Sequence, residues 1–258
     1  MNRIGTLPGG DRLAAGRWLA RPRPVADPRL RVVCIPHIGG GGASFNSWVD
    51  RLPPYAELCA VRFPGRENRI GEALVDDPIV LLDGLQRALM PALDRPFILL
   101  GHCSGSVIAF DLARRLRAAG EAQPAMLIVS STEAPSMRTI ENLHLLPRDE
   151  LLTRVVEFGG MAKEVLDDAD LMTMFERIIR ADYRVVELTR YTAQPPLDIP
   201  ITVIGGRHDE YVDCAALAAW SAETTREFSL HLLDAGHFIL SDAAGVVSTV
   251  VRNVMESR

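Results

Sequence analysis

Residues 97–105 read Phe-Ile-Leu-Leu-Gly-His-Cys-Ser-Gly, and this stretch decides the fold. Its apolar first half is typical of a buried strand and passes directly into a turn flanked by glycines. A helical pattern follows, in which Val107, Ile108, Leu112 and Leu116 repeat at helical spacing. A strand, a sharp turn that carries the nucleophile and a helix form the context that the pattern G-x-S-x-G requires.

The spacing of the glycines selects Cys103 rather than Ser104 as the nucleophile. Gly101 and Gly105 stand two positions before and two after Cys103, whereas the same positions around Ser104 hold histidine and serine. Residues without side chains are needed there so that the strand and the helix can pack closely. A thiol at a helix N-terminus beside an imidazole is also activated for nucleophilic attack. The alternative interpretation is a buried structural cysteine in a glycine-rich turn.

Short apolar runs alternate with amphipathic patterns along the chain. The runs cover residues 30–35, 58–62, 97–100, 126–130, 201–204 and 228–233. This alternation predicts a mostly parallel sheet with helices on both faces, and together with the turn at Cys103 it predicts an α/β-hydrolase fold. From about residue 140 to residue 191 only helical patterns occur. We therefore expect a single domain over residues 1–258, with a helical lid inserted at about 140–191.

The base and the acid of the site should follow the nucleophile in the order acid, then histidine. Of the six histidines, only His231 and His237 lie within or beyond the last apolar run. His231 falls inside the strand pattern, so His237, in the following turn, is the predicted general base. Asp209 follows the preceding run and is the predicted acid that orients the imidazole. Asp213 and Asp234 are its competitors.

Two backbone N–H groups are needed to bind the oxyanion that forms during acyl transfer. One is expected from Ser104, the residue after the nucleophile. The other is expected from Ile38, because residues 35–42 read Ile-Pro-His-Ile-Gly-Gly-Gly-Gly and suit a close backbone approach. A plain flexible loop is the alternative. The glycines do not form G-x-G-x-x-G with a following ribose-binding acid, which excludes a dinucleotide site.

Composition excludes several other functions. The 258 residues are 48% hydrophobic and 24% charged, with a net charge of -5 and no long basic block, so a nucleic-acid partner is not expected. The four cysteines form no C-x-x-C pair, and we expect no metal site and no bound cofactor. The first 28 residues carry charges and prolines, which predict a leader or an edge strand rather than a signal peptide. We expect a cytoplasmic monomer that does not enter the membrane.

Several blocks resemble the type II thioesterases of nonribosomal peptide and polyketide synthesis. They are residues 34–40 (Cys-Ile-Pro-His-Ile-Gly-Gly), 57–69 (Glu-Leu-Cys-Ala-Val-Arg-Phe-Pro-Gly-Arg-Glu-Asn-Arg), 95–102 (Arg-Pro-Phe-Ile-Leu-Leu-Gly-His), 180–183 (Arg-Ala-Asp-Tyr), 200–206 (Pro-Ile-Thr-Val-Ile-Gly-Gly) with Asp209, and 236–238 (Gly-His-Phe). The resemblance implies a substrate, an acyl or aminoacyl group on the phosphopantetheine arm of a carrier protein, and a lid with a narrow channel. It also suggests that Arg62, Arg66 and Arg69 face an acidic carrier domain, with a solvated loop as the alternative.

The sequence departs from that family at several positions. Cysteine replaces serine at position 103, Ser104 stands where methionine is usual, and Glu210 stands where proline is common. His37 and Ile38 replace the common tyrosine and alanine. An acyl group on cysteine is itself a thioester, so its transfer from a carrier thioester is nearly balanced and reversible.

The leading hypothesis is therefore a thioesterase that hydrolyses carrier-bound acyl groups through a triad of Cys103, His237 and Asp209. The alternative is an acyltransferase that moves the group to another carrier or to an amine. A non-catalytic module that binds carrier domains is a third hypothesis, which the complete triad disfavours. A serine replaced by cysteine in the laboratory would give the same sequence.

Overall fold

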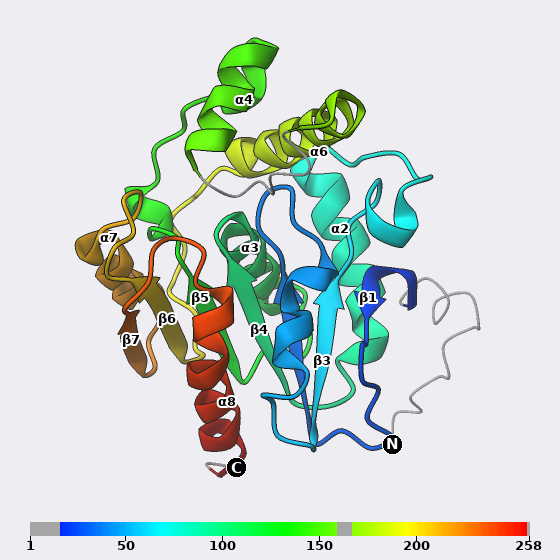
Figure 1. Ribbon diagram of the computed structural model, residues 1–258. Coiled ribbons are helices and arrows are strands. Elements are labelled where there is room, and N and C mark those ends of the chain that lie inside the picture. The colour runs from blue at the N-terminus through cyan, green and yellow to red at the C-terminus, as the bar shows by residue number, and fades with distance from the viewer. Residues whose placement is uncertain (1–15, 159–166, 257–258) are drawn as a thin grey trace.

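The computed structural model describes residues 16–158 and 167–256, and within them one seven-stranded sheet forms the centre of the molecule (Figure 1). The strands are β1 (Leu19–Ala20), β2 (Leu30–Ile35), β3 (Ala56–Val61), β4 (Phe97–His102), β5 (Met126–Ser130), β6 (Ile201–Gly206) and β7 (Phe228–Leu233). Their order is β1-β3-β2-β4-β5-β6-β7. Only β1 runs antiparallel to its neighbour, and the other pairs are parallel. The predicted mostly parallel sheet is therefore confirmed, and the predicted edge strand is β1.

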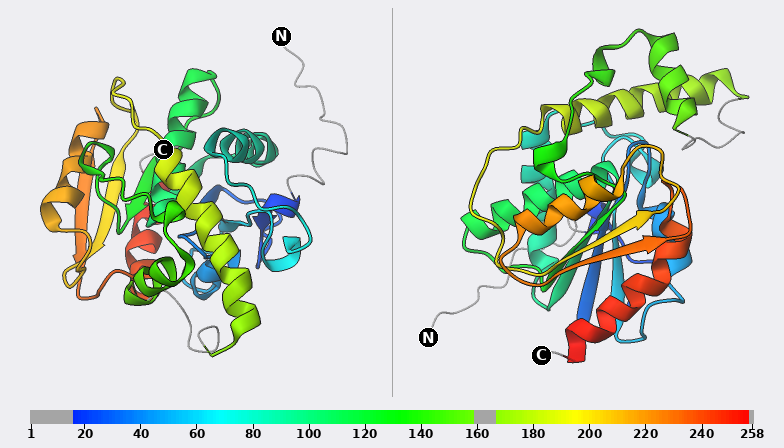
Figure 2. Two further views of the ribbon diagram at one scale, coloured as in Figure 1. Left: turned by 90° about the horizontal axis from the view of Figure 1, so that it is seen from above. Right: turned by 90° about the vertical axis from the view of Figure 1, so that its left-hand side faces the viewer.

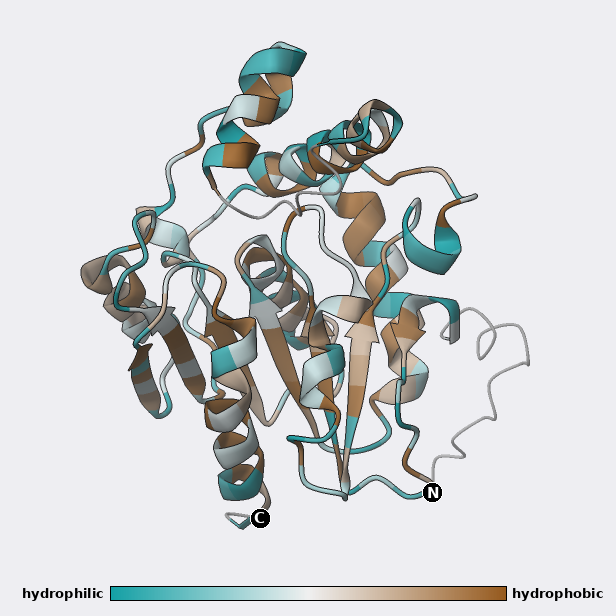
Figure 3. Cartoon of the chain, viewed as in Figure 1, coloured by the Kyte–Doolittle hydropathy of each residue, from teal (hydrophilic) through white to brown (hydrophobic). Residues whose placement is uncertain are grey.

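Helices cover both faces of the sheet, as Figure 2 shows. One face carries α2 (Pro78–Leu89), α3 (Ser104–Ala118) and α7 (Cys214–Ala218), and the other carries α8 (Leu240–Glu256) and the 3-10 helix η1 (Gly42–Trp48). Alternate residues of β2 serve the two layers, since Val33 packs with the first group and Val32 with the second. The central strands are accordingly mostly apolar (Figure 3). This confirms the α/β fold class predicted from continuous apolar runs.

Two helices of the stretch between β5 and β6 lie above the carboxyl ends of the strands (Figure 1). They are α4 (Arg148–Glu157) and α6 (Ala169–Leu188), which we call the helical insertion. The predicted domain (1–258) and lid (about 140–191) both include residues outside the described ranges. The remaining 3-10 helices are η2 (Glu67–Arg69), η3 (Met90–Ala92), η4 (Pro135–Met137), η5 (Leu143–Leu145) and η6 (Ala219–Glu223).

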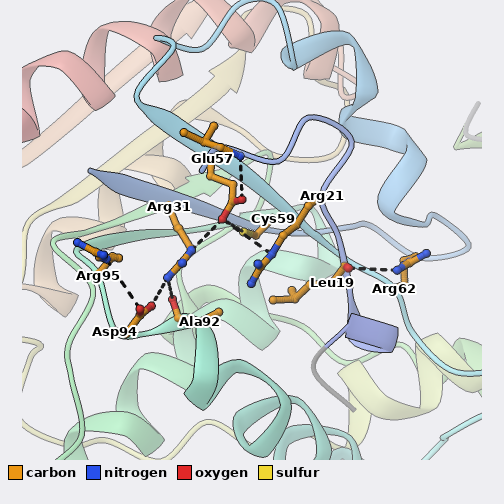
Figure 4. A network of polar contacts seen from close by, with 10 residues as sticks. Leu19, Arg21, Arg31, Glu57, Cys59, Arg62, Ala92, Asp94 and Arg95 are labelled. Carbon is orange, nitrogen blue, oxygen red and sulfur yellow. Dashed lines mark hydrogen bonds and ion pairs between the residues drawn. The ribbon is translucent and has the colours of Figure 1, made fainter. Parts of the chain in front are cut away.

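A buried ion pair fixes the register of β2 against β3 at the end of the sheet away from the insertion. Arg31 lies opposite Glu57 and donates to its carboxylate at 2.9 Å (Figure 4). The same guanidinium donates to Ala92 O at 2.7 Å and pairs with Asp94. A shift of one strand along the other would leave both charges buried without a partner, so the pair specifies one alignment. Glu57 also explains why β3 begins two residues before the predicted run: a charged residue interrupts its apolar pattern.

The described ranges, 16–158 and 167–256, contain no helix that is long and apolar enough to cross a membrane.

Candidate active site

Cys103 occupies the sharp turn between β4 and α3. Its backbone has φ 51° and ψ -123°, in the left-handed half of φ space that non-glycine residues rarely adopt. Its N–H donates to Ser130 O at 2.7 Å, and Thr132 Oγ1 donates to its carbonyl at 2.5 Å. Contacts from the end of β5 thus hold the turn in this conformation.

The flanking glycines are required by close backbone approach. A Cβ atom on Gly101 would lie 2.3 Å from the backbone of Gly105, and one on Gly105 would lie 2.2 Å from the carbonyl oxygen of Ile35. Neither position can hold a side chain unless the backbone moves. This is the physical basis of the spacing that selected Cys103 over Ser104.

His237 and Asp209 meet beside Cys103, although they come from different loops. His237 Nδ1 lies 2.9 Å from Asp209 Oδ2, and the two side chains are 8% and 0% exposed. The other carboxylate oxygen of Asp209 accepts from the backbone N–H groups of Tyr211 at 2.9 Å and Val212 at 3.1 Å. Hydrogen bonds therefore hold the histidine and the acid in place.

The competing residues have other tasks. Asp213 caps α7 by accepting from Ala216 N at 2.7 Å. Asp234 pairs with His208 at 2.7 Å on the exposed surface. His231 is exposed on the edge strand β7. The geometry thus favours Asp209 and His237 over the alternatives that the sequence leaves open.

The electrostatics of His237 and Asp209 agree with a charged pair between these two side chains. Burial lowers the pKa of His237, but hydrogen bonds to Asp209 and Cys103, together with the negative charges of both groups, outweigh it and raise the pKa to about 10. Burial raises the pKa of Asp209, yet the hydrogen bond and charge of His237 and two backbone N–H donors bring it below its usual value. The structure brings Cys103, His237 and Asp209 together, and their catalytic roles stay predictions.

Two further histidines, which the sequence did not identify as neighbours of the site, pack against it. The ring centroids of His102 and His237 are 6.1 Å apart, and those of His37 and His102 are 5.5 Å apart. Burial and the nearby histidines lower the pKa of His37 to about 4 and that of His102 well below its usual value. Of the three rings, His237 is therefore the one that carries a proton at neutral pH.

The two predicted oxyanion donors face one cavity with Cys103. The backbone N–H groups of Ile38 and Ser104 donate no hydrogen bond within the described ranges, and both residues line the cavity. The neighbouring Gly39 N–H is occupied, because it donates to Asp182 of α6 at 2.8 Å. Both donors that the sequence indicated are thus free, and their role also stays a prediction.

The cavity has a volume of about 700 Å³, and the helical insertion forms one of its walls. Phe175, Ile179 and Tyr183 of α6 supply apolar surface. Charged groups reach it as well, among them Glu133 and Arg138. Glu133 has no hydrogen bond or ion pair to any residue in the described part of the chain. The cavity therefore suits a group that combines an apolar chain with polar atoms.

Two of the three arginines thought to face a carrier, Arg66 and Arg69, are buried, so that prediction is wrong for them, whereas Arg62 is half-buried and its part of the prediction stays a prediction. Arg66 and Arg69 are buried, and Arg62 donates to the carbonyls of Gly16 and Leu19. Arg69 pairs with Glu72 at 2.6 Å. Arg66 pairs with Asp182 of the helical insertion. A solvated loop, the alternative, is equally excluded for Arg66 and Arg69.

No group of three or more His, Cys, Asp or Glu side chains within residues 16–158 and 167–256 is arranged to hold a metal ion.

Comparison with known proteins places these features in context. Residues 30–256 match the family described as thioesterase domain. The gramicidin S biosynthesis protein GrsT of Aneurinibacillus migulanus is 32% identical over 88% of this chain and 89% of its own. The AMB antimetabolite synthetase AmbE of Pseudomonas aeruginosa is 36% identical over 95% of this chain, which spans only 12% of AmbE. The structure of the type II thioesterase BorB from the borrelidin biosynthetic cluster superposes with a TM-score of 0.80, at 31% identity, and covers 93% of this chain and 96% of BorB.

Proposed function

The chain belongs to the thioesterase family and is a thioesterase, and on that premise we propose that it hydrolyses acyl or aminoacyl groups from the phosphopantetheine thiol of carrier proteins in nonribosomal peptide or polyketide biosynthesis. Relatives named for such biosynthetic clusters support the substrate. The helical insertion acts as a lid over the acyl group.

The chemistry divides into two half-reactions on Cys103. The sulfur of Cys103 forms a bond to the carbonyl carbon, and the bond from that carbon to the phosphopantetheine sulfur breaks. The departing thiolate takes a proton from the imidazolium of His237. A water molecule then attacks the new thioester, His237 accepts its proton, and the Cys103 sulfur leaves with the free acid as product. The N–H groups of Ile38 and Ser104 stabilise both oxyanions.

The observation that carries the proposal is the position of His237 between Asp209 and Cys103. While the sulfur is charged, both neighbours raise the pKa of the ring, so that His237 is a proton donor. Acylation removes the charge from the sulfur and with it one of the two causes of the shift. His237 then gives up its proton more readily and becomes the base that the second half-reaction needs. The same ring thus suits both roles in turn.

A second function is favoured by one residue, Cys103 itself. Acyl transfer from a carrier thioester to cysteine exchanges one thioester for another and is nearly balanced. Transfer onward to a second carrier thiol or an amine is then as accessible as hydrolysis. An acyltransferase between carriers is therefore the alternative proposal.

One assay tests the proposal and separates the two functions. An acylated carrier protein is incubated with the enzyme, with and without an unloaded second carrier, and both carriers are followed by intact-protein mass spectrometry. Release of free acid without the second carrier supports hydrolysis. Movement of the group only when the second carrier is present supports transfer. Turnover by Cys103→Ala equal to that of the wild type would overturn both.

A further inference from the structure

A side chain of the helical insertion is bonded directly to the loop that carries an oxyanion donor. Asp182 of α6 accepts from the N–H of Gly39 at 2.8 Å and from Arg66 Nη1 at 2.7 Å and Nη2 at 2.5 Å. Arg66 Nη1 also donates to Gly40 O at 3.0 Å. Together these hydrogen bonds form a closed network that joins Asp182, Arg66 and the loop residues Gly39 and Gly40. The free N–H of Ile38 is the one next to the bonded Gly39.

The Arg66–Asp182 pair at the centre of this network is largely shielded from solvent. The side chains of Arg66 and Asp182 are 6% and 13% exposed. A two-bond contact between a guanidinium and a carboxylate fixes the orientation as well as the distance. Removing either partner leaves the other charge buried without compensation. The loop therefore cannot shift far from α6 while the pair is intact.

The same helix also faces the acyl cavity. Ile179 and Tyr183, on either side of Asp182 in the helix, line the cavity, as does Val186. Ile179 also approaches Gly39 so closely that a Cβ atom there would lie 3.3 Å from its side chain, and Gly39 has φ +73°. A group that fills the cavity would thus contact the helix whose Asp182 is bonded to the loop.

We propose that Asp182 is a positioning residue: through Gly39 and Arg66 it ties the position of the helical insertion to the position of the Ile38 N–H, so that the oxyanion site is complete only when α6 is seated over the cavity. This inference rests on the proposed function. It adds that the insertion takes part in catalysis through the loop besides enclosing the acyl group.

Two reagents that share Cys103 but differ in the oxyanion provide the test. A trifluoromethyl ketone forms a tetrahedral adduct with the sulfur and develops an oxyanion, whereas iodoacetamide alkylates the sulfur without one. Asp182→Asn should weaken trifluoromethyl ketone binding and lower kcat by about tenfold or more, because a donor is displaced from its place. Alkylation of Cys103, followed by the mass of its peptide, and KM should stay within about twofold.

Glu176→Gln is the matched control on the same helix. Glu176 pairs with Arg148 of α4 at 2.7 Å and with Arg180 at 2.8 Å, and it has no hydrogen bond to the loop. Glu176→Gln should leave both the binding of the trifluoromethyl ketone and the alkylation of Cys103 unchanged. If Asp182→Asn does not fold, Arg66→Lys provides the same comparison, since it keeps the charge but loses the two-bond geometry.

If Asp182→Asn weakened ketone binding and alkylation equally, or if Asp182→Asn and Glu176→Gln had equal effects, Asp182 would be only a structural contact. Either result would overturn this inference and leave the proposed function intact. A wild-type enzyme that forms no ketone adduct and shows no turnover would overturn the proposed function, and this inference with it.

Discussion

Asp209 accepts a hydrogen bond from His237 Nδ1 at 2.9 Å, and its second oxygen is held by two backbone N–H groups. An asparagine at position 209 keeps the shape but turns an amide N–H toward the ring, which favours the wrong tautomer. We expect Asp209→Asn to lower kcat by about 10³–10⁴-fold with little change in stability. Steady-state kinetics and thermal unfolding check this together. Retention of wild-type kcat would remove Asp209 from the proposed triad.

The proton on His237 should respond to the state of Cys103. Its pKa is about 10 in the free enzyme, partly through the hydrogen bond and charge of Cys103. We expect Cys103→Ala, or alkylation of Cys103, to lower the pKa of His237, measured by NMR titration of the ring. An unchanged titration would show that Asp209 alone sets the pKa.

Stability should depend on the same proton. A pKa raised from 6.5 to about 10 means that the charged ring contributes stability fully below about pH 6.5, and that this contribution is lost as the pH rises through about 10. We expect the difference in unfolding free energy between wild type and His237→Gln to shrink over that interval. Urea unfolding at several pH values measures it. A difference that grows with pH would contradict the sign.

The glycines around Cys103 should tolerate no side chain. Gly101→Ala and Gly105→Ala each place a Cβ within 2.3 Å of backbone atoms, so we expect a loss of about 3 kcal/mol or more in unfolding free energy. Gly245→Ala is the control, because that position lies in α8 and, apart from the adjacent backbone of the helix, no atom lies within 4 Å of the added carbon. It should gain about 0.5–1 kcal/mol. Equal effects at the three positions would refute the close-packing argument.

Glu133 should favour substrates that carry a positive charge. It lines the cavity without a hydrogen bond or ion pair among the described residues, and although its charge also acts on Arg138 of the same cavity, the amine of an aminoacyl group would meet it there. We expect Glu133→Gln to raise KM for an aminoacyl thioester by about tenfold, and to leave KM for an uncharged acyl thioester of equal length unchanged. Parallel changes for both substrates would exclude this role.

Replacement of the nucleophile should separate the two proposed reactions. In Cys103→Ser the acyl group forms an ester, so its return to a carrier thiol becomes uphill while hydrolysis stays downhill. We expect transfer between carriers to fall by at least about tenfold relative to hydrolysis. Intact-protein mass spectrometry of both carriers gives the ratio. An unchanged ratio would show that the nucleophile does not decide the acceptor.

The parts of the site that could be predicted from sequence are those with a local cause. The turn at Cys103 is predictable because the lack of space for a side chain at positions 101 and 105 requires glycine, and this spacing is visible in the sequence. The choice among Asp209, Asp213 and Asp234 needed the structure, since each stands in a loop and only the packing of two loops decides which one meets His237. Their catalytic use is still to be tested.

The arginines show where such reasoning fails. Arg66 reads as a surface charge, and its partner Asp182 lies 116 residues away in a helix of another segment. No periodicity or motif connects the two. The start of β3 is a milder example, because the charge of the buried Glu57, which Arg31 compensates, interrupts the apolar pattern of the strand.

The place of the helical insertion in the chain has a consequence for protein engineering. Cys103 follows β4, Asp209 follows β6 and His237 follows β7, whereas α4 and α6 fall between β5 and β6. The proposed catalytic residues and much of the cavity wall thus come from separate segments of the chain. Substitutions in the insertion can therefore alter the cavity wall while β4, β6, β7 and the turns that follow them keep their sequence. Asp182 is an exception, because this carboxylate of the insertion also accepts from the N–H of Gly39, next to the predicted oxyanion donor Ile38.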